Sequence, residues 1–242
     1  MRVDNQAAYL IHSRQYTDSK VILNVLTPDY GRVSLVHRQS PKSKKSKLQA
    51  FTPLSCSWQG KSALKTAMQI EMLHPAFQLQ GNALYCGIYL NELVERCLAQ
   101  DDPHEEIYYS YQRAVARLSE LGREETQIDI ERSLRSFEFQ LLESLGFAID
   151  FEYDVQQAPI VQNSQSAYVF VVDEGFVPLA VDDEKSRNES LLRRDVFPSK
   201  AIHDIKAGEF NSEALKYAKR LARIALQPLL GSKPLKAREL FH

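Results

Sequence analysis

Residues 20–36 read KVILNVLTPDYGRVSLV, and this stretch decides the fold of the N-terminal part of the chain. Lys20–Leu26 is apolar and rich in β-branched residues, which favours a strand. Thr27–Gly31 has the composition of a turn, because Pro28 fixes its own φ and Gly31 accepts a positive φ. Arg32–Val36 alternates in part between apolar and polar residues, which indicates a further strand.

Three more strands are expected around this stretch. They are Ala7–Ile11, Phe51–Trp58 and Leu64–Met72, whereas the polar residues 12–19 are predicted to form a loop. Five short strands with no intervening helix, within about 70 residues, are typical of a small barrel of the OB type.

Helical periodicity begins after Gly81. Three amphipathic helices are predicted, over residues 82–99, from an N-cap at Asp102 to about Glu120, and over residues 129–145 with Gly146 following as the C′ residue. Beyond them we expect short strands within 151–157 and 167–181, one or two short helices within 186–206 and a helix over 212–226. The fold class is therefore α+β, with an OB barrel (1–79), an α-helical domain (80–150) and a small mixed C-terminal region (151–242) packed on the helical domain.

The segment from Tyr30 to Ile70 contains no Asp or Glu. Its centre, residues 37–47, reads HRQSPKSKKSK and lacks apolar side chains, so it is predicted to be a solvated basic arm between two strands. Such a concentration of positive charge suits a polyanion, and nucleic acid is the usual one. A loop that only increases solubility remains the alternative.

OB folds bind oligonucleotides across the face of strands 2 and 3, and single strands need cations together with exposed aromatic rings. Phe51, Trp58 and Tyr9 lie within strand sequences and are expected in the core. Tyr16 and Tyr30 lie in polar loops and could stack on bases. The candidate nucleic-acid-binding residues are Arg14, Tyr16, Tyr30, Arg32, Arg38, Lys42, Lys44, Lys45, Lys47 and Lys61.

The formal net charge of −1 conceals a strong segregation of charge. The net charge is +7 over residues 1–78, −8 over 79–150, −5 over 151–195 and +5 over 196–242. This pattern suggests that the two ends share a polyanionic ligand while the middle faces something else. The helix at 212–226 carries a second basic face, which is either a phosphate contact or simply solvated: Lys216, Lys219, Arg220 and Arg223.

No catalytic motif is present among the common phosphate-binding, metalloprotease and hydrolase patterns, which disfavours an enzyme. Cys56, Cys86 and Cys97 have no metal-ligand spacing, so neither a metal nor another cofactor is expected. The N-terminus lacks an apolar signal segment and no apolar run approaches 18 residues. We therefore expect a cytoplasmic protein that does not enter a membrane.

A set of short motifs runs through nearly the whole chain. They are AYLIHSR (8–14), Thr27 with Gly31 and Arg32, LQAFTPL (48–54), YLNEL (89–93), LRSFE (134–138) with Leu141, Leu142 and LGF (145–147), and LGSKPLKAREL (230–240). Together and in this order, these motifs resemble those of the RecO family of DNA repair proteins. One departure is that many members hold zinc with four cysteines in the last third, whereas this chain has no Cys after Cys97. The strands and turns near 151–181 are then expected to hold together by packing alone.

The resemblance implies a non-enzymatic recombination mediator of the RecF pathway, acting at the nucleoid. Such proteins bind single- and double-stranded DNA, anneal complementary strands and work with RecR to load RecA on strands coated by SSB. A protein adaptor that does not bind DNA and an OB-fold enzyme acting on nucleic acid remain alternatives.

The resemblance also implies contact with the acidic, apolar C-terminal tail of SSB. Such a tail needs an apolar pocket with a cation at its rim. The candidates are Arg132, Arg135, Phe137 and Leu141. The alternative for Arg135 is an ion pair within its own helix, to Glu131 or Glu138.

Overall fold

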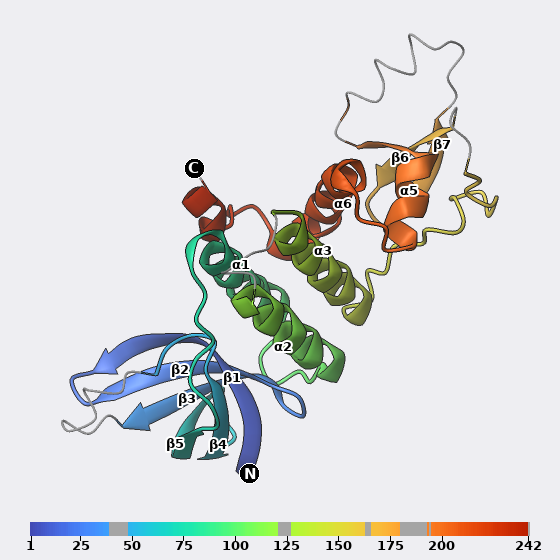
Figure 1. Cartoon of the computed structure of the whole chain (residues 1–242). Coiled ribbons are helices and arrows are strands. Elements are labelled where there is room, and N and C mark those ends of the chain that lie inside the picture. Colours follow the sequence, from blue (N-terminus) through green and yellow to red (C-terminus); the bar gives the residue numbers. More distant parts are fainter. Residues whose placement is uncertain (39–47, 121–126, 163–165, 180–192, 194, 242) are drawn as a thin grey trace. The chain divides into compact units, whose positions relative to one another are not determined.

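The computed structural model describes residues 1–38, 48–120, 127–162, 166–179, 193 and 195–241. The chain divides into two compact units (Figure 1). The first unit comprises Met1–Glu125 together with Ser232–His242, and the second comprises Thr126–Gly231.

The first unit contains the closed barrel that the sequence predicts. Its strands are β1 (Arg2–Thr17), β2 (Lys20–Thr27), β3 (Gly31–Arg38), β4 (Pro53–Gln59) and β5 (Leu64–Met72). They follow the order β1-β2-β3-β5-β4, and β4 pairs with β1 to close the barrel. All pairs are antiparallel except β3 with β5. The OB fold is confirmed.

Alternate residues of the strands fill the barrel. Val21, Leu23 and Val25 of β2 belong to the buried cluster inside it, together with Trp58. The expected core positions of Tyr9, Phe51 and Trp58 are confirmed, since their side chains are buried. Ile22 and Asn24 therefore occupy the outer face of β2.

The expected loop at residues 12–19 is wrong over most of its length. Residues 12–17 continue β1 and pair with β2, with Arg14 opposite Ile22 and Thr17 opposite Lys20. These β1 residues are exposed to solvent. A strand segment without a buried face shows no apolar alternation, so the sequence pattern gives no sign of it.

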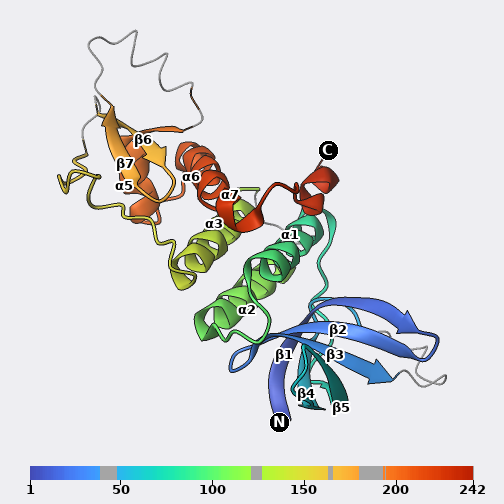
Figure 2. The ribbon, with the colours of Figure 1, turned by 180° about the vertical axis from the view of Figure 1, so that it is seen from behind.

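Helices α1 (Gly81–Cys97) and α2 (Glu105–Glu120) belong to the first unit (Figure 2). The predicted N-cap at Asp102, with Pro103 as the first helical residue, is wrong, because α2 begins at Glu105, two residues later. The preceding segment is held to the barrel instead. The amide of Asp101 donates to the carbonyl of Arg32 at 3.0 Å, and Lys65 Nζ lies 2.5 Å from the Asp101 carboxylate.

Asn91 on α1 joins the barrel to both helices. Its Nδ2 donates to the carbonyl of Ile11 on β1 at 2.8 Å, and its Oδ1 accepts from the Tyr111 hydroxyl on α2 at 2.6 Å. Asn91 and Tyr111 are both buried. Burial raises the pKa of Tyr111 well above its ordinary value, so the phenol keeps the proton that it donates.

The C-terminal segment returns to the first unit. The carboxylate of Glu92 accepts from the amides of Lys236 and Ala237 at 3.0 and 2.8 Å, at the start of the 3₁₀ helix η2 (Lys236–Phe241). Arg96, one turn further along α1, donates to the carbonyls of Lys233 and Pro234. The two sequence motifs YLNEL and LGSKPLKAREL therefore meet in space.

The second unit contains α3 (Gln127–Ser144), a sheet of β6 (Ala167–Val171), β7 (Gly175–Leu179) and β8 (Val196–Pro198), and the helices α5 (Ser199–Lys206), α6 (Ser212–Ala225) and α7 (Gln227–Leu230). The sheet order is β7-β6-β8. Gly146 ends α3 as predicted, because its amide donates to Glu143 and that of Phe147 to Leu142.

The division into units differs from the three parts expected. Helices α1 and α2 belong with the barrel, whereas α3 packs against α6 of the second unit (Figure 1). An amphipathic pattern shows that a helix has a face to bury, but it does not identify the element that covers this face.

Residues 150–160 are held by hydrogen bonds as well, and not by packing alone as expected from the sequence. The Asp150 carboxylate accepts from the amides of Glu152 and Tyr153, and that of Asp154 accepts from Gln156 and Ala158.

Gly31 is predicted to be the glycine least tolerant of substitution in the first unit. It has φ +60°, and a Cβ there would overlap the backbone carbonyl of Asp102. Gly81 is a matched control, since it has φ +53° but open space around the added atom. We expect Gly81→Ala to cost about 1–2 kcal/mol of unfolding free energy and Gly31→Ala at least about 3 kcal/mol. Chemical denaturation of both variants measures this, and equal losses would contradict the close approach.

Asn91 and Tyr111 are predicted to act as a coupled pair. Asn91→Ala leaves the Ile11 carbonyl without this donor, and we expect a loss of about 2–5 kcal/mol. Tyr111→Phe removes the hydrogen bond between the phenol and Asn91. The double variant should therefore lose less unfolding free energy than the two single variants together, by about 0.5–3 kcal/mol. Denaturation of the three variants gives this coupling, with the exposed Tyr16→Phe as an additive control. Strict additivity with Tyr111→Phe would contradict the bridging role.

Candidate nucleic-acid interface

Three cations meet on the outer face of strands β1–β3. Lys20 on β2 lies directly opposite Arg38 on β3, in the same register that places Ile22 opposite Val36. Arg14 on β1 lies opposite Ile22. Because directly paired residues share a face, and Val21 and Leu23 point inward, the side chains of Lys20, Arg38 and Arg14 belong to the outer face.

Like charges placed directly opposite each other destabilise a sheet. Lys20 and Arg38 form such a pair, both are exposed, and within the described ranges neither forms an ion pair. Arg14 is exposed in the same way. An anion lying across the strands would turn this repulsion into attraction, so the arrangement suits a phosphate backbone.

Tyr16 extends this group. It lies at an irregularity of the β1–β2 register, next to the turn, and is 54% exposed. An exposed ring beside several cations is the combination that binds single-stranded nucleic acid. We call Arg14, Tyr16, Lys20 and Arg38 the basic end of the barrel. In Figure 1 the β1–β2 turn and the end of β3 lie at the same end of the barrel.

Helix α1 covers the other part of this outer face. Ser34 donates to Asn24 Oδ1 at 2.9 Å, and Asn24 Nδ2 donates to the Glu95 carboxylate on α1 at 2.9 Å. Asn24 is buried as a result. The helix therefore restricts any ligand of this face to the basic end.

The remaining barrel candidates differ in their surroundings. Tyr30 is half-buried, and its ring meets that of Trp58 edge-on at 5.3 Å, so it packs against the barrel core. Arg32 is also half-buried, and its Nε donates to the carbonyl of Leu98 at 3.3 Å. Lys61 is exposed on the β4–β5 loop. The four arm lysines, Lys42, Lys44, Lys45 and Lys47, lie outside the described residues.

Lys20 is not among the candidates predicted from the sequence. A lysine at the start of an apolar strand is unremarkable in the sequence, and only the register with β3 places it opposite Arg38. His37, the neighbour of Arg38, lies opposite the inward-facing Val21, and burial lowers the pKa of its imidazole. It is therefore not a cation of the basic end at neutral pH.

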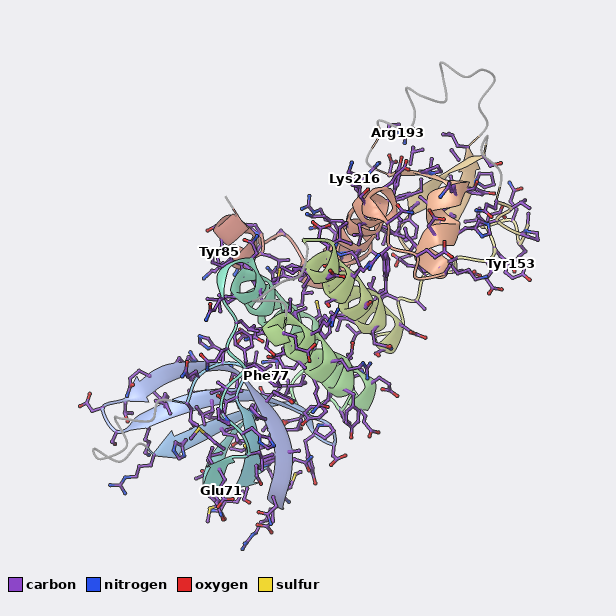
Figure 3. All side chains as sticks on the ribbon, in the orientation of Figure 1. Glu71, Phe77, Tyr85, Tyr153, Arg193 and Lys216 are labelled. Carbon is purple, nitrogen blue, oxygen red and sulfur yellow. The ribbon has the colours of Figure 1, made fainter. Side chains whose placement is uncertain are left out.

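The second basic face, on α6, is partly used within the second unit. Arg220 lies over the rings of Phe197 and Tyr217, at 5.5 and 5.2 Å, and donates to the carbonyl of Val196. Lys219 Nζ lies 3.8 Å from the Glu131 carboxylate on α3. Lys216 and Arg223 are exposed, and Figure 3 shows Lys216 on α6.

The four candidates on α3 differ in their exposure to solvent. Arg135 is only 5% exposed and pairs with Glu138 at 2.9 Å, so the intrahelical alternative is the arrangement found. Phe137 and Leu141 are buried. Arg132 reaches the surface, where its Nε donates to the carbonyl of Phe210. A helix pattern marks Phe137 and Leu141 as apolar, but whether another part of the chain covers them depends on the tertiary fold.

The described residues hold no group of three or more His, Cys, Asp or Glu that could bind a metal ion. Burial raises the pKa of the Cys56 thiol to about 12, and it raises that of Cys97 to about 11 although Arg96 lowers it. Both thiols are therefore protonated at neutral pH and poor nucleophiles. No helix in the described ranges has the length and hydropathy to cross a membrane.

Comparison with known proteins covers the whole chain. The model of the recombination protein O N-terminal domain matches residues 1–76, and that of the C-terminal domain matches residues 78–239. Curated relatives named DNA repair protein RecO include that of Cellvibrio japonicus, which is 41% identical, with 100% of this chain and 98% of the relative covered. That of Coxiella burnetii (strain RSA 331) is 39% identical over 99% and 98%, and that of Haemophilus influenzae (strain 86-028NP) is 35% identical over 100% and 97%. The chain belongs to the RecO family of DNA repair proteins.

Proposed function

We propose that this chain is a recombination mediator that binds single- and double-stranded DNA, anneals complementary strands and, with RecR, loads RecA onto strands coated by SSB. Its place of action is the cytoplasm, at the nucleoid. Membership in the RecO family supports a role in DNA repair as a mediator of recombination. The observation that carries the DNA-binding part is that Lys20 lies opposite Arg38, with no ion pair to either among the described residues, near Arg14 and the exposed ring of Tyr16.

The proposed mechanism is electrostatic and needs no covalent chemistry. Two complementary strands repel each other through their phosphates. Cations of the basic end neutralise some of these phosphates and release counterions, which lowers the repulsion between the strands. Tyr16 provides a surface on which a base can stack, worth about 1–3 kcal/mol. The arm lysines Lys42, Lys44, Lys45 and Lys47 adjoin Arg38 in the sequence and would extend the cationic track.

DNA affinity is predicted to depend on salt through the basic end. Replacing Lys20 and Arg38 by Ala removes about two phosphate contacts, so the slope of log K against log salt for a single strand should flatten by about 1.4. Fluorescence anisotropy of a labelled oligonucleotide across a salt series measures this slope. Arg2→Ala with Arg113→Ala removes the same charge elsewhere in the first unit and serves as the matched control. Ala at the four arm lysines should flatten the slope further.

Equal slopes for the Lys20/Arg38 variant and the wild type would contradict the proposed site. Complete absence of binding by the wild type at low salt would favour the protein adaptor. Cleavage or joining of the oligonucleotide on addition of magnesium would favour an enzyme.

We further propose that the C-terminal tail of SSB binds on α3, with Arg132 as the cation. Among the four candidates it is the one whose side chain is well exposed, at 49%. Arg135 instead compensates the buried charge of Glu138. Removing Arg135 is therefore expected to harm folding rather than binding alone.

Arg132→Ala is predicted to weaken binding of an SSB tail peptide several-fold, while Lys216→Ala, an exposed cation on α6, leaves it unchanged. Isothermal titration with the peptide measures both, and thermal denaturation checks that the variants fold. Wild-type affinity in Arg132→Ala would remove α3 from consideration as the binding site.

A further inference from the structure

Residues 152–161 of the second unit form a small hairpin with an apolar outer face. Tyr153 lies opposite Pro159 in an isolated antiparallel bridge, and the amide of Ile160 donates to the carbonyl of Glu152. Asp154 and Ile160 are buried. Their neighbours Tyr153, Val155 and Val161 are 43%, 38% and 65% exposed, and we call these three the hairpin face.

Hydrogen bonds hold the hairpin in this form. The Asp154 carboxylate accepts from the amides of Gln156 and Ala158 at 2.8 and 3.0 Å. His203 on α5 lies with Nε2 2.6 Å from the carbonyl of Ile160. These hydrogen bonds stabilise the conformation in which the apolar side chains of the hairpin are exposed. A fixed, exposed apolar group is typical of a surface that meets another protein.

The surroundings of the hairpin face are acidic. The amide of Val155 donates to the carbonyl of Phe176 on β7, which places the hairpin beside the β6–β7 turn. That turn carries Asp173 and Glu174, both exposed. The exposed Glu152 of the hairpin is paired with Lys206, so it adds no net charge. Nucleic acid would be repelled here. The matching partner has an apolar side chain surrounded by cations.

The basic end of the barrel has this chemistry, with the exposed ring of Tyr16 among Arg14, Lys20 and Arg38. The chain is nearly neutral overall, with a net charge of −1, but residues 1–78 carry +7 and residues 151–195 carry −5. Copies of such a chain attract each other through regions of opposite charge.

We propose that the hairpin face binds the basic end of a second copy of this chain. In Figure 3, Tyr153 lies at the rim of the second unit, in the outer position that the contact needs. The surface involves few side chains, so the association is weak and depends on salt. It rests on the proposed function in one respect: DNA and the second copy compete for the same basic end, so DNA disperses the assembly.

Sedimentation velocity of the full chain tests this proposal. At about 50 mM salt we expect the sedimentation coefficient to rise with protein concentration, and at about 500 mM salt we expect this rise to disappear. Adding a single-stranded oligonucleotide at low salt should disperse the assembly into protein–DNA complexes. A coefficient that does not change with concentration at low salt would overturn the proposal, whether or not the protein binds DNA.

Two variants identify the surfaces. Tyr153→Ser with Val161→Ser should abolish self-association and leave DNA affinity unchanged. Tyr109→Ser with Leu73→Ser removes residues of similar exposure, 43% and 51%, and should leave self-association intact. Lys20→Glu, which gains an ion pair with Arg38 and so keeps its fold, should weaken both self-association and DNA binding.

Assembly that persists in the Tyr153/Val161 variant would exclude the hairpin face. Assembly that the oligonucleotide does not disperse would exclude the basic end as the second surface. Failure of the wild type to bind DNA would contradict the proposed function and not the self-association, because self-association is measured without DNA.

Discussion

The first unit depends on the two hydrogen bonds made by the side-chain amide of Asn91. It uses both of its polar ends, donating to β1 through the Ile11 carbonyl and accepting from α2 through the Tyr111 hydroxyl. A buried amide that lost either partner would leave a polar group uncompensated, so the bond pair specifies one arrangement of barrel and helices. The next residue, Glu92, holds the C-terminal segment in the same way through two backbone amides.

This arrangement determines which part of the barrel can meet a ligand. With α1 fixed against the barrel, Glu95 reaches Asn24 and covers one part of the outer face of β1–β3. The other part keeps Lys20 opposite Arg38, although this pairing costs stability in the absence of an anion. Packing and the proposed DNA contact thus use different parts of a single sheet face. The charge segregation along the sequence also separates the two proposed surfaces. The acidic middle of the chain contains the hairpin face, and the basic N-terminal part contains the basic end.

Much of this could be predicted from the sequence, and the failures have physical causes. Strands with buried residues along most of their length, such as β2 and β4, and the end of α3 at Gly146 were predictable, because burial and backbone geometry restrict the local sequence directly. Residues 12–17 of β1 were not, because an exposed strand needs no apolar alternation. The pairing of Lys20 with Arg38 and the burial of Arg135 depend on register and tertiary contacts, which no local pattern specifies. The grouping of α1 and α2 with the barrel rather than with α3 depends on tertiary contacts in the same way.

The central claim is that DNA lies on the basic end of the barrel, and photo-crosslinking tests it most directly. A single-stranded oligonucleotide carrying iododeoxyuridine would be irradiated in complex with the full chain, and the linked peptides would be identified by mass spectrometry. Our account predicts that the linkage occurs in the peptide containing Tyr16, the exposed aromatic residue of the basic end. Linkage confined to residues 127–231, with none in β1–β3, would contradict it.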